Sequence, residues 1–255
     1  MKATEAVKGI VFRSARLTGA MRRLRVLLHW LRGRPHEADF DFLRHPAFAS
    51  GLLLDLGANI GQSALSVAAV QPGLQIHSIE ANPACEPGLK TAAALLGRRF
   101  RYRVVGVGAR AGRLDFHVPV RASRMLLEEG TFDAATLVSD SSIARIGRQG
   151  RDYTLQVISV PLVTVDALQL HPRVVKMDLQ GLELAALAGM VQTIESAHPV
   201  FMIEIGEHHA QIVEFLAARG YSRWCWDGRC LQAGVRPDTL NAIFIARGDP
   251  ALPVA

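Results

Sequence analysis

Residues 52–63 constrain the fold of this chain more than any other stretch. An apolar run ends near Asp55, a turn with Gly57 and Gly61 follows, and a helical apolar pattern begins after Ser63. A buried strand, a tight glycine turn and a helix in this order form the first unit of a nucleotide-binding α/β fold. The stretch therefore predicts a ligand site at the carboxyl end of this strand.

The residue between the two glycines, Asn59, narrows the choice of ligand. A dinucleotide fingerprint has glycine at the middle position so that the backbone can approach a pyrophosphate. A second apolar strand, residues 74–80, ends at Glu80. A carboxylate about 20 residues beyond the glycines is placed to bind the ribose hydroxyls. Adenosine without a pyrophosphate predicts S-adenosylmethionine as the cofactor, and the side chain of Asn59 disfavours NAD.

Other residues near the turn are candidates for cofactor binding. Asp55 can receive the ammonium of the methionine moiety, directly or through water, or can bracket the N–H groups of the loop. Gln62 and Ser63 either cap the following helix or touch the cofactor. Asn82 either contacts the cofactor or caps a helix that begins with Pro83. The remaining candidates at this edge are Gly57, Asn59, Gly61, Glu80 and Val107.

Strand and helix patterns alternate along most of the chain. Expected strands cover residues 52–56, 74–80, 101–107, 173–179 and 200–205, and expected helices cover residues 61–70, 83–96, 164–170, 182–195 and 208–219. Such alternation predicts an α/β fold with a doubly wound, mostly parallel sheet covered on both faces.

Two regions depart from the alternation. Residues 114–118 and 155–160 have β patterns around a polar loop, Ser139–Ser142. Residues 221–226 and 241–246 have the pattern of a hairpin, which predicts an antiparallel strand near the C-terminal edge of the sheet.

The positive charge of the chain is concentrated at its N-terminus. Residues 1–36 hold nine lysines and arginines against one acid, Glu5, and carry +8, whereas all 255 residues carry +6. The remainder therefore sums to −2, which predicts no nucleic-acid partner. With 49% hydrophobic residues, the chain can bury one large core. We expect a basic helical arm over residues 1–36 and a single domain over residues 37–255.

Apolar residues recur at helical spacing across residues 4–32 of the arm, with arginines beside them. A helix of this kind can lie on an anionic membrane surface as a peripheral contact, or it can bind a partner protein. The alternative is a lid that packs on the domain with its arginines in solvent.

The sequence also bears on the compartment. No run of about 18 apolar residues occurs, and the arm lacks the uninterrupted apolar core and cleavage site of a signal peptide. The three cysteines are too few, and odd in number, for a disulfide framework. We therefore expect a cytoplasmic protein with reduced thiols.

Acidic residues stand at the ends of four expected strands. Ligands of open α/β sheets bind outside the carboxyl ends of the strands, and a buried carboxylate needs a partner or a function. These positions are therefore the first place to look for chemistry. They are Asp55, Glu80, Asp178 and Glu204.

The chain resembles the FkbM-type methyltransferases in several segments that occur in the family's order over residues 50–245. They are Asp55-Leu-Gly-Ala-Asn-Ile-Gly-Gln-Ser63 with the acid Glu80, Val160-Pro-Leu-Val-Thr-Val-Asp166, Val175-Lys-Met-Asp-Leu-Gln-Gly-Leu-Glu183 with Leu187-Ala-Gly189, and Pro199-Val-Phe-Met-Ile-Glu204. The resemblance implies the Rossmann-like class I methyltransferase fold and dependence on S-adenosylmethionine. It also implies O-methylation of sugars or of hydroxyls in secondary metabolites.

Methyl transfer to a hydroxyl needs a group that removes the proton, or a divalent metal that acidifies it. Asp178 is the first candidate for the base, Glu204 the second, and His208 or His209 the third. Lys176 shares a strand face with Asp178 and can pair with it. The sequence assigns no metal ligands.

Three residues in the same segments bear on whether the chain is active and on which acids have structural roles. Gln180 stands where the family pattern has glutamate, and it keeps open a degenerate cofactor-binding scaffold without activity. Glu183 fits the first turn of a helix, and Asp166 fits an N-cap. The expected function is methylation of a hydroxyl on a small molecule such as a sugar, glycolipid or secondary metabolite. A nitrogen or carboxylate acceptor remains an alternative.

Overall fold

The structure is a computed structural model, and it describes residues 15–121, 124–125, 154–206, 208–234, 236 and 239–251. The first fourteen residues of the expected arm and the polar loop Ser139–Ser142 lie outside the described residues.

The central sheet has eight strands in the order β11-β10-β12-β9-β8-β1-β2-β3. Their bounds are β1 Gly51–Leu56, β2 Leu74–Glu80, β3 Phe100–Val104, β8 Val174–Met177, β9 Val200–Glu204, β10 Tyr221–Trp226, β11 Leu231–Ala233 and β12 Asn241–Ala246. The five strands β9, β8, β1, β2 and β3 are mutually parallel, and β12 pairs antiparallel with β9. The expected α/β sheet with an antiparallel C-terminal edge is confirmed.

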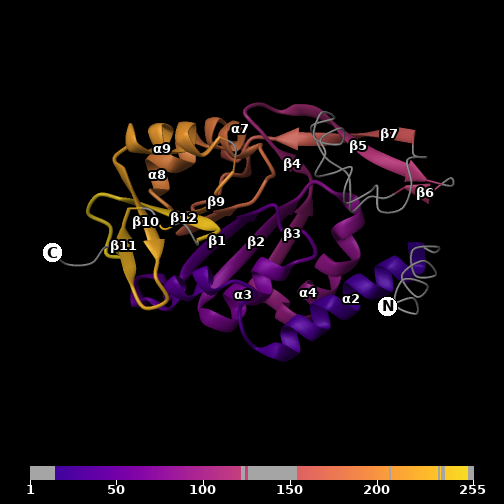
Figure 1. Cartoon of the computed structure of the whole chain (residues 1–255), viewed down its shortest axis with the longest axis horizontal. Coiled ribbons are helices and arrows are strands. Elements are labelled where there is room, and N and C mark those ends of the chain that lie inside the picture. The colour runs from indigo at the N-terminus through magenta and orange to yellow at the C-terminus, as the bar shows by residue number, and fades with distance from the viewer. Residues whose placement is uncertain are drawn as a thin grey trace.

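Helices cover both faces of this sheet (Figure 1). The helices on one face are α2 Ala15–Arg32, α3 Gln62–Val70 and α4 Glu86–Leu96, and those on the other are α7 Glu183–Ala188, α8 Val191–Ala197 and α9 His209–Ala217. Successive residues of a strand point to opposite faces, so Leu53 enters one buried cluster and Leu54 the other. Each such side chain contributes about 1.5–3 kcal/mol when it is fully buried.

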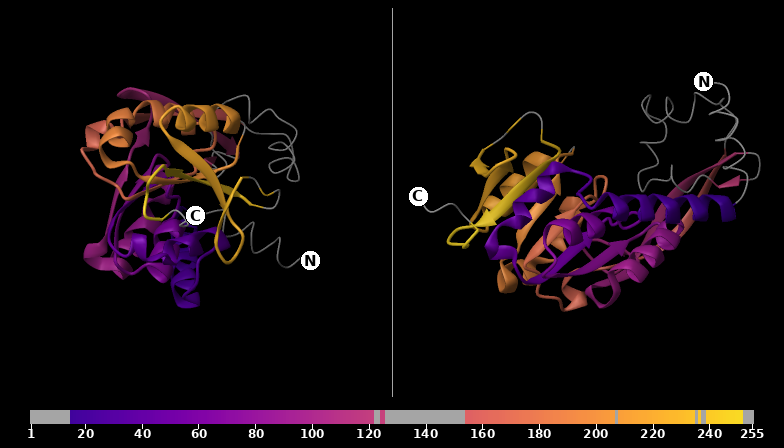
Figure 2. Two further views of the ribbon diagram at one scale, coloured as in Figure 1. Left: turned by 90° about the vertical axis from the view of Figure 1, so that its left-hand side faces the viewer. Right: turned by 90° about the horizontal axis from the view of Figure 1, so that it is seen from below.

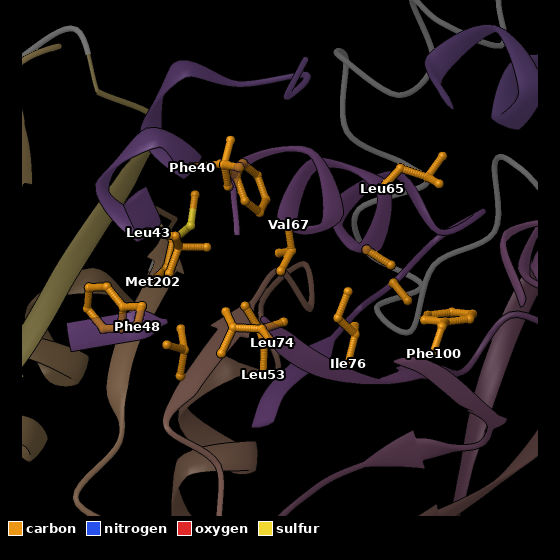
Figure 3. Close-up of a cluster of buried hydrophobic side chains, with 14 of the residues drawn as sticks. Phe40, Leu43, Phe48, Leu53, Leu65, Val67, Leu74, Ile76, Phe100 and Met202 are labelled. Atoms are coloured by element: carbon orange, nitrogen blue, oxygen red, sulfur yellow. The ribbon is translucent and has the colours of Figure 1, made fainter. Parts of the chain in front are cut away.

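The cluster under α3 also receives aromatic rings from the segment that precedes β1 (Figure 3). Phe40 and Phe48 are fully buried, and the ring of Phe48 packs edge-on against Phe42 at 5.3 Å between centroids. These rings anchor the segment between α2 and β1 to the sheet, and so they fix where the C-terminal end of α2 lies on the domain.

A second sheet, with the order β4-β7-β5-β6, lies beyond the β3 edge of the first (Figure 1). It consists of β4 Gly106–Val107, β5 Gly112–Arg121, β6 Arg124–Met125 and β7 Thr154–Val163. The expectation of one strand over residues 101–107 is wrong, because the chain leaves the first sheet at Val105 and pairs with β7 from Gly106 onward. The β segments expected at residues 114–118 and 155–160 are confirmed as the antiparallel pair β5 and β7.

Two expected helices are also corrected. Residues 164–170 form only a short 3-10 turn, Asp166–Leu168, because Gln169 adopts a left-handed conformation with φ 52°. The helix expected over residues 182–195 is broken at Gly189 into α7 and α8. A Cβ on Gly189 would lie 2.1 Å from the carbonyl oxygen of Gly108, so the break brings two backbones into contact.

Asp166 caps a helix, but not the one expected from its position in the sequence. Its carboxylate accepts hydrogen bonds from the backbone N–H of Thr193 at 2.8 Å and from the Thr193 hydroxyl at 2.7 Å, at the start of α8. The expectation that Asp166 is the N-cap residue of its own helix is wrong, because Asp166 lies inside the 3-10 turn and its carboxylate binds the first turn of α8 instead.

Helix α2 packs against α3 and α4 (Figures 1 and 2). Val26 is fully buried, and the buried guanidinium of Arg22 donates a hydrogen bond to the carbonyl of Ala84. On α3, Ser66 Oγ lies 3.3 Å from His29 Nε2 and 2.6 Å from His36 Nδ1. The described part of the arm is therefore a helix attached to the domain along one face.

None of the helices in the described part of the chain has both the length and the apolar character needed to cross a bilayer.

Candidate active site

A cavity of about 330 Å³ opens at the carboxyl ends of the parallel strands, the edge where ligands of open α/β sheets bind. The central sheet supplies the turn after β1, the end of β2 and the loop after β8. The second sheet supplies β4 and one side chain each from β5 and β7, and helix α2 supplies two arginines. These lining residues are Arg22, Arg25, Gly57, Asn59, Ile60, Gln62, Ile79, Glu80, Ala81, Asn82, Cys85, Val105, Gly106, Val107, Phe116, Leu162, Asp178, Leu179, Gln180 and Leu182.

The glycine turn after β1 is held against the neighbouring loop by close backbone packing. Gly57 has φ 85°, and a Cβ there would lie 1.8 Å from the carbonyl oxygen of Asp178. Asn59 has φ 51°, a conformation that asparagine tolerates better than most residues. The turn therefore needs glycine at position 57, and the Asn59 side chain occupies the space that a dinucleotide site keeps clear.

Glu80 stands at the end of β2 and lines the cavity. One carboxylate oxygen accepts the backbone N–H of Asn59 and the other accepts the N–H of Asn82, each at 2.7 Å. Burial raises the pKa of the Glu80 carboxyl, although these two backbone hydrogen bonds oppose the shift. Glu80 thus fixes both turns and still offers lone pairs to hydroxyl groups in the cavity.

Asp55 does not line the cavity. It is fully buried below the turn, where Oδ2 accepts a hydrogen bond from Ser78 Oγ at 2.7 Å and Oδ1 has no partner among the described residues. Burial raises the pKa of Asp55, while the positive charge of Lys176 opposes that shift. Asp55 therefore has no exposed atom in the cavity wall that could contact a methionine ammonium directly.

Lys176 is a buried cation between two carboxylates, Asp55 and Asp178. Its side chain is 5% exposed, and Nζ lies 3.2 Å from Asp178 Oδ2. Burial alone would lower the pKa of Lys176, but the charges of Asp55 and Asp178 outweigh it and raise the pKa. The pairing expected between Lys176 and Asp178 is confirmed, and the lysine also compensates Asp55.

Asp178 is the strand-end acid that reaches the cavity beside the turn of Gly57. Glu204 ends the next strand, β9, where its exposed side chain lies near the Asp178 carboxyl but outside the cavity wall. Partial burial, together with the adjacent Asp178 carboxyl, raises the pKa of Glu204 to about 7. The two expected base candidates are therefore neighbours, and of the two only Asp178 lines the cavity.

The segment before β1 carries polar groups that lie near Lys176 and Glu204 but outside the cavity wall. Asn241 stands opposite Glu204 across the β9–β12 ladder, and its Nδ2 donates to Glu37 Oε2 at 2.9 Å and to Asp39 Oδ2 at 3.0 Å. Burial, followed by the positive charges of His29 and Lys176, lowers the pKa of His36 to about 4.

Arg22 and Arg25 were missed as cavity residues, because the sequence shows them only as part of a basic arm. Arg22 is buried where α2 meets the domain, whereas Arg25, three positions later, is exposed at the margin of that face and still reaches the cavity.

The remaining cofactor candidates divide into two groups. Gln62 and Val107 line the cavity, and so does Asn82, which also caps the following 3-10 turn by accepting the N–H of Ala84 at 2.9 Å. Ser63 is buried, and Gly61, with φ 95°, forms the N-cap of α3. Neither Gly61 nor Ser63 belongs to the cavity wall.

The histidines at the start of α9 lie away from the cavity wall. His208 is half-buried at the N-cap of α9. The ring of His209 lies 6.2 Å from that of Phe244, and neither of its nitrogens has a hydrogen-bond partner among the described residues. The structure thus favours Asp178, which lines the cavity, over the histidines as the base.

Gln180 belongs to a loop that is held by another residue. The Glu183 carboxylate accepts the backbone N–H of Leu179 at 2.7 Å and that of Gly181 at 3.0 Å. Glu183 lies in the first turn of α7, as expected. The loop is therefore anchored without a carboxylate at position 180, although Gln180 itself lines the cavity.

No three histidine, cysteine, aspartate or glutamate side chains in the described ranges come together in a way that could hold a metal ion.

The buried charges predict a specific pattern of stability. Replacing Lys176 with methionine leaves Asp55 buried without its cation, and we expect a loss of about 3–5 kcal/mol in the free energy of unfolding. The second change Asp55→Asn in the same protein should recover part of that loss, because it removes the uncompensated charge.

Urea unfolding of the single and double variants measures this coupling. Lys90→Met is the matched control, since Lys90 pairs with Glu86 on the surface of α4 and should contribute about 1 kcal/mol or less. A loss in Lys176→Met no larger than in the control would contradict the assignment.

Comparison with known proteins identifies the family. The chain matches the Methyltransferase FkbM domain over residues 55–223. No match is found among curated proteins.

Several solved structures are similar to the chain. The FkbM methyltransferase of Methylobacillus flagellatus KT shares 16% sequence identity with a TM-score of 0.49, over 77% of this chain and 44% of that one. This chain thus spans less than half of that relative. The O-methyltransferase of Bacillus cereus in complex with SAH shares 10% identity with a TM-score of 0.40, over 89% and 91% of the two chains.

Human methyltransferase-like protein 13 in complex with SAH shares 15% identity with a TM-score of 0.38, over 86% of this chain and 82% of that one. The family match covers well over half of the sequence and includes the glycine turn, the strand-end acids and the loop of Gln180. This chain therefore belongs to the FkbM methyltransferase domain family.

Proposed function

We propose that this chain transfers a methyl group from S-adenosylmethionine to a hydroxyl of a small molecule such as a sugar, glycolipid or secondary metabolite. The family makes it a methyltransferase. The observation that carries the choice of a hydroxyl acceptor is the Asp178 carboxyl in the cavity wall, because a hydroxyl must lose its proton when it is methylated.

The cavity suits a nucleoside cofactor without a pyrophosphate. Its volume of about 330 Å³ is at the lower end of small-molecule sites. Glu80 would hold the ribose hydroxyls with the lone pairs that its two backbone hydrogen bonds leave available. The backbone turn at Gly57 and the side chain of Gln62 would border the methionine part.

The cofactor supplies an electrophilic methyl group on a sulfonium. When S-adenosylmethionine is bound, its methyl group would pass to the acceptor oxygen, S-adenosylhomocysteine would leave, and Asp178 would take the hydroxyl proton. Lys176 keeps Asp178 in place through the 3.2 Å ion pair. Glu204 releases its own proton near pH 7, and the negative charge that it then carries near Asp178 would favour proton transfer to Asp178. Such alignment of acceptor and base supplies the rate enhancement.

The acceptor can be tested by the position of the transferred methyl group. The protein is incubated with isotopically methyl-labelled S-adenosylmethionine and with separate pools of sugars, glycolipids, amines and carboxylic acids, and products are located by mass spectrometry. Label on oxygen of a hydroxyl supports the proposal. Label on nitrogen or in an ester overturns it, and cofactor binding with no transfer to any pool favours the scaffold interpretation.

Glu80 can be tested through the ribose. Glu80→Ala should weaken binding of S-adenosylhomocysteine by about 1.5–3 kcal/mol, the range for hydrogen bonds to a charged group. The wild type should also bind the 2′-deoxyribose analogue more weakly, whereas Glu80→Ala should discriminate little between the two ligands. Calorimetry measures all four affinities, and Glu214→Ala, an exposed acid on α9, is the control. Equal discrimination by wild type and Glu80→Ala would refute the ribose assignment.

The pH dependence tests the carboxyl pair. Because the pKa of Glu204 is raised to about 7, the Glu204 carboxyl holds a proton below that pH and loses it above, which adds a negative charge near Asp178. The rate of methyl transfer should therefore rise as pH increases through about 7. Glu204→Gln keeps the size of the side chain without a titrating proton, so this rise should disappear while affinity for S-adenosylhomocysteine stays unchanged. Glu214→Gln should keep the rise, and a rise that persists in Glu204→Gln would assign it to another group.

A further inference from the structure

We propose that the outward face of helix α2 docks on an anionic membrane surface. The face consists of Leu24, Leu27, Leu28 and Leu31, together with the arginines beside them. This inference is independent of the methyl acceptor, because it rests on the exposed side of the helix rather than on the cavity.

The apolar side chains of this face are exposed and continuous. Leu24, Leu27, Leu28 and Leu31 follow the spacing of one helix face and are 54%, 39%, 45% and 78% exposed. The opposite face holds the buried residues that fix α2 to the domain, namely Arg22, Val26 and His29. A stripe of leucines in water has no structural purpose within the described domain.

The stripe is also unusual for this molecule. Seven large apolar side chains are exposed in the described part of the chain, and five of them lie on α2. The fifth is Trp30, which is 41% exposed at the margin of the stripe. Contiguous apolar surface of this kind marks an interaction site, whereas isolated exposed leucines do not.

Charge identifies the partner. Helix α2 contains no acidic residue. At 100° per residue, Arg23 lies on one side of the leucine stripe and Arg25 and Arg32 lie on the other, and all three are exposed. Arginines on both sides of an apolar stripe, with tryptophan at its margin, match a helix that lies in the plane of an anionic bilayer surface.

The same charges disfavour a second copy of this chain as the occupant. Two α2 helices packed face to face would bring rows of arginine together with no acidic residue on either helix to pair with them. An anionic lipid surface instead offers both apolar depth for the leucines and negative charge for the arginines.

Docking requires little rearrangement of the helix. Its inner face is already held by Val26 in the core and by the hydrogen bond from Arg22 to the Ala84 carbonyl. The backbone is therefore ordered before contact, and binding does not incur the cost of folding a helix. Arg25 lies on the same helix and lines the cavity, so docking would hold the cavity next to the bilayer surface.

Vesicle sedimentation with the full chain tests the proposal. Vesicles of phosphatidylcholine alone are compared with vesicles that also contain phosphatidylglycerol, at low and high salt. We expect binding to the anionic vesicles that weakens with salt and is absent from the neutral ones. The double change Leu28→Glu and Leu31→Glu should lower binding by about tenfold or more. Arg23→Gln with Arg32→Gln should lower it about fivefold per arginine.

Val157→Glu is the matched control, because Val157 is 50% exposed on β7, outside α2. It should sediment like the wild type. Thermal unfolding of every variant checks the fold, and the substituted side chains are all exposed. Failure to bind anionic vesicles, equal binding to neutral vesicles, or unchanged binding in the leucine variant would overturn the proposal. An oligomer in sedimentation velocity that only the leucine variant disperses, without vesicle binding, would assign the face to a second copy.

Discussion

The ammonium of Lys176, buried at the carboxyl end of β8, is the charge on which the acidic edge of the sheet depends. It lies between Asp55, sealed below the glycine turn, and Asp178, which reaches the cavity. Without this cation the end of β1 would hold an uncompensated carboxylate in the core. With it, the protein can keep a second carboxyl, Glu204, beside Asp178 with a pKa near neutral pH.

The cavity is assembled from parts that are distant in the sequence. The turn after β1 and the end of β2 form one wall, and Glu80 joins them through two backbone hydrogen bonds. The second sheet contributes Phe116 and Leu162, and helix α2 contributes Arg22 and Arg25. Helix α2 therefore forms part of the cavity wall and also carries an exposed apolar face. A surface that binds this face would lie close to the cavity.

Local signals in the sequence predicted much of the sheet, while tertiary contacts decided the rest. The strand expected over residues 74–80 coincides with β2, because an apolar run and its bounding turns are local properties. The exit of the chain at Val105 depends on pairing with β7, far along the sequence, and no local pattern reveals it. Likewise, Glu80 and Asp178 reach the cavity as predicted, but the burial of Asp55 follows from the loop packed above it.

The measurement that tests the central claim most directly is calorimetric titration of the full chain with S-adenosylmethionine and S-adenosylhomocysteine, with NAD and NADP as controls. A cavity that carries a ribose-binding acid and a side chain at Asn59 should bind the first two with micromolar dissociation constants and neither of the dinucleotides. Binding of NAD would contradict the claim that the turn with Asn59 between Gly57 and Gly61 disfavours a dinucleotide. Absence of binding by all four ligands would contradict the assignment of the cavity as a cofactor site.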